Sequence, residues 1–157
     1  MIILAIDPGY ERLGVAIIDK DRGKKENLIH SECFKTDAKL PFEDRVLEIG
    51  NKIEEMISIH KPYVLAIETL FFSKNTKTAM RVAETRGVII YIAKKNNLII
   101  KEINPMEIKL AVTGDGKSDK QQMTKMVQLI LGINKKTTDD EYDAIACGLA
   151  CSAFIKY

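Results

Sequence analysis

The sequence predicts an α/β fold with a mixed five-stranded sheet flanked by helices. Two observations carry this prediction. Three apolar segments separated by short polar turns open the chain, as in an antiparallel meander, and from residue 42 onward helical and strand patterns alternate. A chain of 157 residues, 46% apolar and 29% charged, can bury a sizeable core. We therefore expect a single domain over residues 1–157.

The first three strands are predicted from apolar runs and turn residues. Ile2–Ile6 is continuously apolar and ends before a Pro-Gly turn, as expected of a strand buried on both faces. Leu13–Ile18 and Asn27–Phe34 follow across polar turns and complete the meander. One explanation for Gly9 and Gly14 is that they simply serve the first turn, because glycine admits positive φ.

The alternating part of the chain begins with an amphipathic helix. Apolar residues recur three or four apart from Phe42 to Ile57, and Pro62 ends the pattern. Tyr63–Ile67 is the next predicted strand. A long helix from about Asn75 to Lys95 then leads to a strand at Leu98–Ile100.

Two capping boxes predict the last two helices. Ser118-x-x-Gln121 opens a helix whose apolar residues point inward, and Thr138-x-x-Glu141 opens the final one.

Composition excludes several classes of protein. No apolar run reaches the roughly 20 residues of a membrane helix, and MIILAIDPGY lacks the features of a signal peptide, so we expect a cytoplasmic protein without a membrane partner. Cys33, Cys147 and Cys151 lack CxxC spacing, and His30 and His60 are the only histidines. A disulfide framework and a structural zinc site are thereby excluded.

Charge is segregated along the chain. Residues 70–136 contain 13 Lys or Arg against 5 Asp or Glu, and the remainder contains 11 against 17. A basic block of this kind is typical of a protein that binds a polyanion, although a solvated lysine-rich face gives the same pattern.

The two most apolar strands both end in an acid, Asp7 and Glu68. If these strands are parallel neighbours, the two carboxylates lie side by side at the carboxyl edge of the sheet, where α/β proteins bind ligands. Buried like charges repel each other, and a hard divalent cation relieves the repulsion. All-oxygen ligands favour Mg²⁺ or Mn²⁺.

Further acids lie in the first turn of the final helix. Asp139 and Glu141 are equally well explained by the helix dipole. Asp143 precedes a mostly apolar helix and is expected to point toward the core. Helical geometry pairs Asp143 with either Asp139 or Asp140. Four carboxylates from two strand ends and one helix are the ligand set of a two-metal phosphodiesterase.

Several short motifs occur together in a specific order. They are Ile6-Asp7-Pro8-Gly9 with Gly14, Ile67-Glu68 with Phe71, Lys74 and Asn75, Arg86-Gly87-Val88, Lys109 with the Gly114/Gly116 loop before Lys120, and Asp140-x-x-Asp143-Ala-Ile-Ala. Over nearly its whole length the chain resembles the RuvC family of Holliday junction resolvases, which have an RNase H-like fold. The D-x-x-D match selects Asp140 over Asp139.

The resemblance implies a structure-selective endonuclease of DNA recombination and repair. Asp7, Glu68, Asp140 and Asp143 would bind two Mg²⁺ ions, for which Mn²⁺ can substitute, and cleave four-way junctions. A homodimer would nick opposed strands symmetrically, and a branch-migration helicase would be a partner. The implied DNA contacts are Phe71, Lys74, Asn75, Lys109, Lys117 and Lys120.

Other interpretations of these features exist. Phe71 could anchor its loop on the core rather than wedge against bases, and the helix from Asn75 could be sandwiched within the domain instead of forming the dimer contact. Asp7-x-Gly9 with Gly14 also resembles the phosphate loop of actin-like and sugar-kinase ATPases, but those proteins need two such domains. The remaining alternatives are an RNA nuclease of the YqgF type and a junction-binding module that does not cleave.

Overall fold

The structure, a computed structural model, describes residues 1–70 and 76–155. Its elements are β1 (Ile2–Asp7), β2 (Arg12–Asp19), β3 (Asn27–Lys35), α1 (Phe42–His60), β4 (Val64–Glu68), α2 (Thr76–Lys95), β5 (Ile99–Ile103), α3 (Pro105–Thr113), α4 (Lys120–Leu131) and α5 (Asp139–Phe154). The predicted α/β, RNase H-like class with a mixed five-stranded sheet is confirmed.

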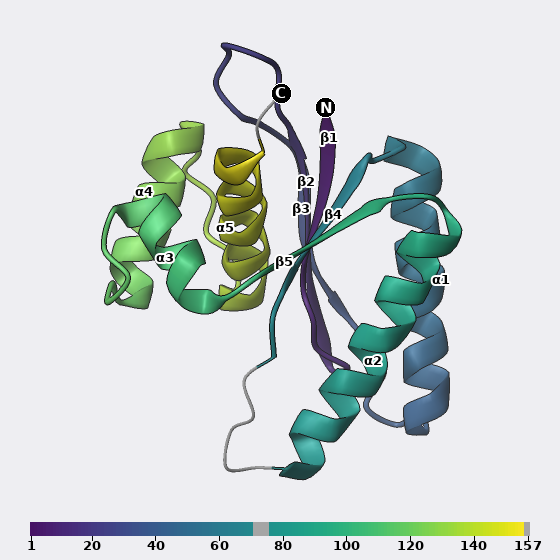
Figure 1. The fold of residues 1–157 in the computed structure, drawn as a ribbon. Helices are drawn as coiled ribbons and strands as arrows, with labels where there is room; N and C mark the ends of the chain where they lie inside the picture. Colours follow the sequence, from purple (N-terminus) through teal and green to yellow (C-terminus); the bar gives the residue numbers. More distant parts are fainter. Residues whose placement is uncertain (71–75, 156–157) are drawn as a thin grey trace.

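The sheet has the order β3-β2-β1-β4-β5. β1, β2 and β3 form the expected antiparallel meander, whereas β4 and β5 run parallel to β1. Helices cover both faces: α1 and α2 lie on one side, and α3, α4 and α5 on the other (Figure 1). The carboxyl ends of β1 and β4 therefore share one edge of the sheet.

Two cores fill the space on either side of the sheet. In β1, Leu4 and Ile6 belong to the core under α1 and α2, and Ile3 and Ala5 belong to the core under α5. This alternation follows from the two-residue period of a strand. The next residue, Asp7, is thereby directed to the α5 side.

Three expectations about elements were wrong or incomplete. Helix α3 was not predicted from the sequence, although Asn104 caps it with a capping box to Glu107 and proline occupies its first turn. The N-cap of α4 is Asp119, which pairs with Gln122, rather than Ser118. The Ser118 hydroxyl is instead used within the α3–α4 turn, where it donates to the Asp115 carbonyl at 2.7 Å. β5 extends to Ile103, beyond the predicted end.

Glycines allow α5 to approach the sheet closely. A Cβ at Gly148 would lie 2.7 Å from Ile18 Cδ1 and 3.0 Å from Ala5 Cβ. Gly9 and Gly14 are absent from the glycines with positive φ, so the conformational role expected for them is wrong. They are required for space, because a Cβ at Gly9 would lie 2.2 Å from the Arg12 carbonyl oxygen.

In the described part of the chain, no helix is both long enough and apolar enough to span a membrane.

Candidate active site

Asp7 and Glu68 come together because β1 and β4 pair in parallel. The last paired residues are Ile6 and Ile67, and each acid follows directly. Glu68 follows Ala66 by two residues, and Ala66 belongs to the core under α5. Both acids are thus directed to the same face, toward the start of α5.

α5 brings the other acids to this edge. Thr138 is the predicted N-cap and accepts from the Glu141 amide at 3.4 Å, but the predicted capping box is incomplete, because the Glu141 side chain accepts from Ser31, Lys135 and Thr137 instead. The Asp140 side chain is 24% exposed, whereas that of Asp139 is 76% exposed. Burial therefore distinguishes the two acids that helical spacing left equivalent, and it favours Asp140 beside Asp143.

Burial and neighbouring charges raise the pKa values of Asp7, Glu68 and Asp143. Burial, followed by the charges of Asp143, Glu68 and Asp140, raises the pKa of Asp7 to about 7. Burial and then Asp143 raise the pKa of Glu68. Burial also raises the pKa of Asp143, against the opposing effect of Lys120. The four carboxylates form one electrostatic cluster that a proton or a cation stabilises.

Two basic residues pair with the acids from α5. Lys120 Nζ lies 3.5 Å from Asp143 Oδ2 and 3.3 Å from Asp139 Oδ2. Arg12 Nε lies 3.5 Å from Asp140 Oδ2. Burial opposes protonation of Lys120, yet the pairing with Asp143 and Asp139 leaves its pKa raised. Asp7 and Glu68 have no ion pair with any residue that the structure describes.

The surface around the acids is hollowed. One depression is lined by Glu68, Asp143, Lys109 and Lys120 together with Pro105 and other residues of α3 and α4. A second contains Asp7, Glu68 and Pro105. The two depressions share Glu68 and Pro105, so they adjoin at these residues, and we refer to them together as the concave surface.

The donor set at this edge fits a hard divalent cation. All of the candidate ligands are carboxylates, and no described side chain donates a hydrogen bond to Asp7. Thr69 Oγ1, next to Glu68, is buried and has no hydrogen-bond partner among the residues that the structure describes. An unsatisfied buried hydroxyl beside clustered acids fits a site that holds a water molecule or an ion.

The carboxylates lie close together, but they do not converge on one point as bound metal ligands would. Among residues 1–70 and 76–155, no group of three His, Cys, Asp or Glu side chains stands at metal-holding geometry. Asp140 and Asp143 are instead turned to Arg12 and Lys120. Binding an ion thus requires these side chains to exchange their basic partners for the metal.

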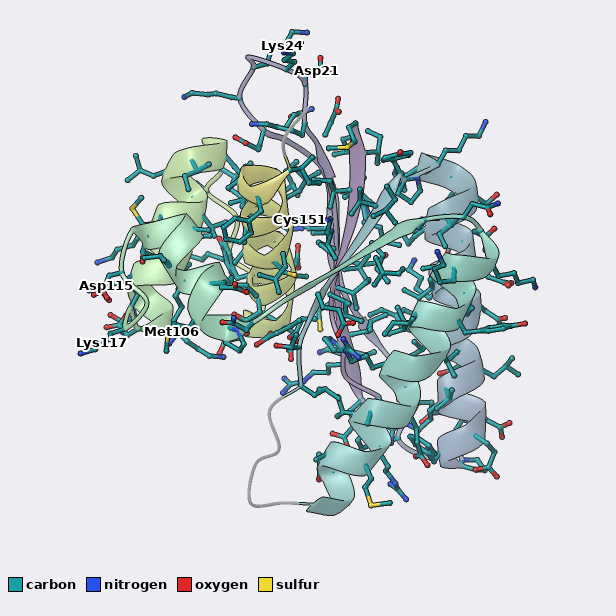
Figure 2. The ribbon with its side chains drawn as sticks, in the orientation of Figure 1. Asp21, Lys24, Met106, Asp115, Lys117 and Cys151 are labelled. Atoms are coloured by element: carbon teal, nitrogen blue, oxygen red, sulfur yellow. The ribbon has the colours of Figure 1, made fainter. Side chains whose placement is uncertain are left out.

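The predicted DNA contacts fall in different places. Lys109 and Lys120 line the concave surface. Lys117 is exposed in the α3–α4 turn, at the outer tip of the molecule (Figure 2). Phe71, Lys74 and Asn75 lie outside the described residues.

Sequence reasoning missed the role of Glu141. Its side chain is 3% exposed and accepts from Lys135 Nζ and Ser31 Oγ, each at 2.5 Å, and from Thr137. Burial opposes ionisation, but these hydrogen bonds leave the pKa of Glu141 lowered. Glu141 connects the first turn of α5 to β3 through Ser31 and to the preceding loop through Lys135 and Thr137. The contact with β3 is long-range and has no signal in the sequence.

Comparison with known proteins agrees with this architecture. The family model described as Crossover junction endodeoxyribonuclease RuvC matches residues 3–151. The chain belongs to the RuvC family. The resemblance seen in the motifs is thereby confirmed.

Relatives named Crossover junction endodeoxyribonuclease RuvC match nearly the full chain. The protein of Caldicellulosiruptor saccharolyticus is 39% identical over 161 residues, covering 100% of this chain and 97% of the relative. That of Brachyspira hyodysenteriae is 43% identical over 150 residues, covering 96% and 92%.

Solved structures share the fold. RuvC of T. thermophilus in complex with Holliday junction substrate superposes with a TM-score of 0.89 at 28% identity, covering 96% of this chain and 92% of that one. The yeast mitochondrial Holliday junction resolvase superposes with a TM-score of 0.70 at 14% identity, covering 97% and 76%. This second likeness bears on the fold alone.

Proposed function

We propose that this protein is an endonuclease that cleaves four-way DNA junctions by metal-dependent phosphodiester hydrolysis. One observation carries the proposal: in a chain of the RuvC family, β1 and β4 place Asp7 and Glu68 beside the acids of α5 at one sheet edge. Family membership supports the junction as substrate, and the carboxylates support the chemistry.

Asp7, Glu68, Asp140 and Asp143 would hold Mg²⁺, with two ions per site and Mn²⁺ as a substitute. When bound, the metal supplies an activated water and stabilises the leaving oxygen. The chain contributes the negative charge that attracts the ions. It also contributes the concave walls that orient the strand.

Lys109 and Lys120 would bind the phosphates that flank the cleaved bond. Both line the concave surface that contains Glu68 and Asp143. If Asp143 holds the metal, Lys120 would give up this partner, keep only the exposed Asp139, and be able to turn to the DNA. Phe71, Lys74, Asn75 and Lys117 remain proposed contacts outside the cluster.

The active form would be a homodimer, which places two sites on the symmetric junction. Large apolar side chains that are exposed on α1 and α2, among them Leu47, Met80 and Tyr91, support this assembly. A branch-migration helicase remains the proposed partner. Sedimentation should give a dimer, and a monomer at micromolar concentration with and without junction would contradict the proposal.

Cleavage of a synthetic four-way junction tests the function directly. The protein should nick opposed strands in Mg²⁺ or Mn²⁺, be inactive in EDTA, and leave linear duplex of the same sequence intact. Preferential cleavage of RNA would instead indicate a nuclease of the YqgF type. Tight junction binding without cleavage in either metal would indicate a binding module.

A further inference from the structure

Two aromatic rings hold a pair of arginines beside the β1–β2 turn. Tyr10 and Phe42 meet edge to face, with ring centroids 5.6 Å apart. The guanidinium carbon of Arg81 lies 5.6 Å from the centroid of Tyr10 and 5.1 Å from that of Phe42. The guanidinium carbon of Arg45 lies 5.0 Å from the Tyr10 centroid. A cation over the face of an aromatic ring is electrostatically attracted to it.

The two arginines have different surroundings. Arg45 is 7% exposed, and its Nε donates to Thr36 Oγ1 at 2.8 Å, so its role is to fix the turn. Arg81 is half-buried on α2. Within the described residues, Arg81 forms no ion pair with a carboxylate. Its charge is therefore available to an external anion.

Arg12 adds a third cation next to the acids. Its side chain is 58% exposed, and it pairs with Asp140. Arg12, Tyr10 and Asp140 line one hollow, whose opposite wall is formed by Thr78 and Val82 of α2. Arg81 lies between those two wall residues in the sequence of α2, and its guanidinium lies over the ring of Tyr10, so Arg81 stands next to the hollow that Arg12 lines. Glu11 also lines this hollow.

The carboxylates are thus bordered by cations on two sides. Lys109 and Lys120 belong to α3 and α4, which cover one face of the sheet (Figure 1). Arg81 belongs to α2, which covers the other face, and Arg12 begins β2. The lysines are a proposed contact already, whereas nothing in the motif pattern pointed to the arginines.

We propose that Arg12 and Arg81 form a second phosphate-binding surface, which binds the DNA strand on the side of the carboxylates away from the lysines. A strand that crosses four acids is repelled unless cations bind its phosphates both before and after the cleaved bond. Arginine suits this role, since its planar fork matches a phosphate and stacks on aromatic rings. The rings also order Arg81 before DNA arrives. This inference rests on the proposed junction-cleaving function.

Salt dependence of junction binding tests the inference. Binding is measured in EDTA, so that no strand is cut, for the wild type, Arg12→Gln, Arg81→Gln and Arg81→Lys. Each lost phosphate contact should lower the slope of log affinity against log salt by about 0.9. Arg22→Gln is the matched control, because Arg22 is exposed in the β2–β3 turn, at the other end of β2 from Arg12.

We expect Arg12→Gln and Arg81→Gln each to reduce the slope by about one unit, Arg81→Lys to restore most of it, and Arg22→Gln to keep the wild-type slope. Wild-type slopes in both Gln variants would overturn the inference. So would an equal loss in the Arg22 control. If Arg81→Gln fails to fold, the exposed Arg12 still decides the outcome.

A Mn²⁺ titration without DNA separates phosphate binding from a simple counter-ion role. If Arg12→Gln bound Mn²⁺ more tightly while the salt slope of junction binding stayed unchanged, Arg12 would only neutralise Asp140. That result would overturn the proposal for Arg12. A wild type that binds junction no better than linear duplex would instead contradict the proposed function itself.

Discussion

The backbone of Asp140 rests directly on Gly14. A Cβ added at Gly14 would lie 2.0 Å from the Asp140 carbonyl oxygen and 3.1 Å from Asp7 Cβ. Gly14 is also the β2 partner of Asp7 in the antiparallel register. The absence of a side chain at this one position lets α5 deliver its acids to the strand that carries Asp7.

Gly14→Ala should therefore abolish most cleavage while the protein still folds. The added methyl group cannot coexist with the Asp140 carbonyl, so the first turn of α5 must move and carry Asp140 and Asp143 away from Asp7. Junction cleavage and thermal unfolding measure the two effects. A folded Gly14→Ala variant with wild-type cleavage would show that the close contact is not needed for the active geometry.

Asp7→Asn and Glu68→Gln should each lose cleavage and keep junction binding. The acids hold metal, whereas the basic residues bind phosphate, and removing a negative charge near the DNA can only favour binding. Cleavage rates in Mg²⁺ and binding in EDTA report the two properties. A folded variant of either kind that cuts at nearly the wild-type rate would contradict the metal assignment.

Three substitutions at the start of α5 test which acids are ligands. Asp140→Asn and Asp143→Asn should lose most cleavage. Asp139 is exposed and sits in the first turn, so Asp139→Asn should cost only about 0.5 kcal/mol of stability through the weakened helix terminus. Cleavage and thermal unfolding are compared for all three. An inactive Asp139→Asn beside an active Asp140→Asn would reverse the assignment.

Stability of the metal-free protein should fall as pH rises toward 7. The pKa of Asp7 is raised from 3.8 to about 7 in the folded state, so between these values the folded protein binds more protons than the unfolded chain. The free energy of unfolding therefore decreases across this range and levels off above it. The raised pKa values of Glu68 and Asp143 act in the same direction.

The difference between wild type and Asp7→Asn isolates this contribution. Asn carries no charge to desolvate, so in EDTA at pH 8 the variant should be more stable by something on the order of 3 kcal/mol, and the gap should close toward pH 4. Thermal unfolding at several pH values gives the comparison. A gap that is independent of pH would mean that Asp7 is not destabilised by its neighbours.

Lys109→Ala and Lys120→Ala should each reduce the salt slope of junction binding by up to about one unit. Lys24→Ala is the control, since Lys24 lies at the opposite end of the sheet from the acids (Figure 2). Affinity is measured across a range of salt concentrations. Unchanged slopes and cleavage in both lysine variants would place the DNA surface elsewhere.

Several features of the site were readable from the sequence because their causes are local. The apolar runs before Asp7 and Glu68 predicted two buried strands that end in acids, and Thr138 predicted the start of α5. Strand period, helix capping and turn residues act over a few neighbouring positions. A pattern that spans only a few neighbouring residues can be recognised in the sequence without knowledge of the fold.

Other features were decided only by tertiary structure. Parallel pairing of β1 with β4 made Asp7 and Glu68 neighbours, and the packing of α5 on Gly14 buried Asp140 while it left Asp139 in solvent. The contact of Glu141 with Ser31 and the pairing of Arg12 with Asp140 join segments more than 100 residues apart. Contacts of that range depend on the register and separation of whole elements, which no local spacing of residue types specifies.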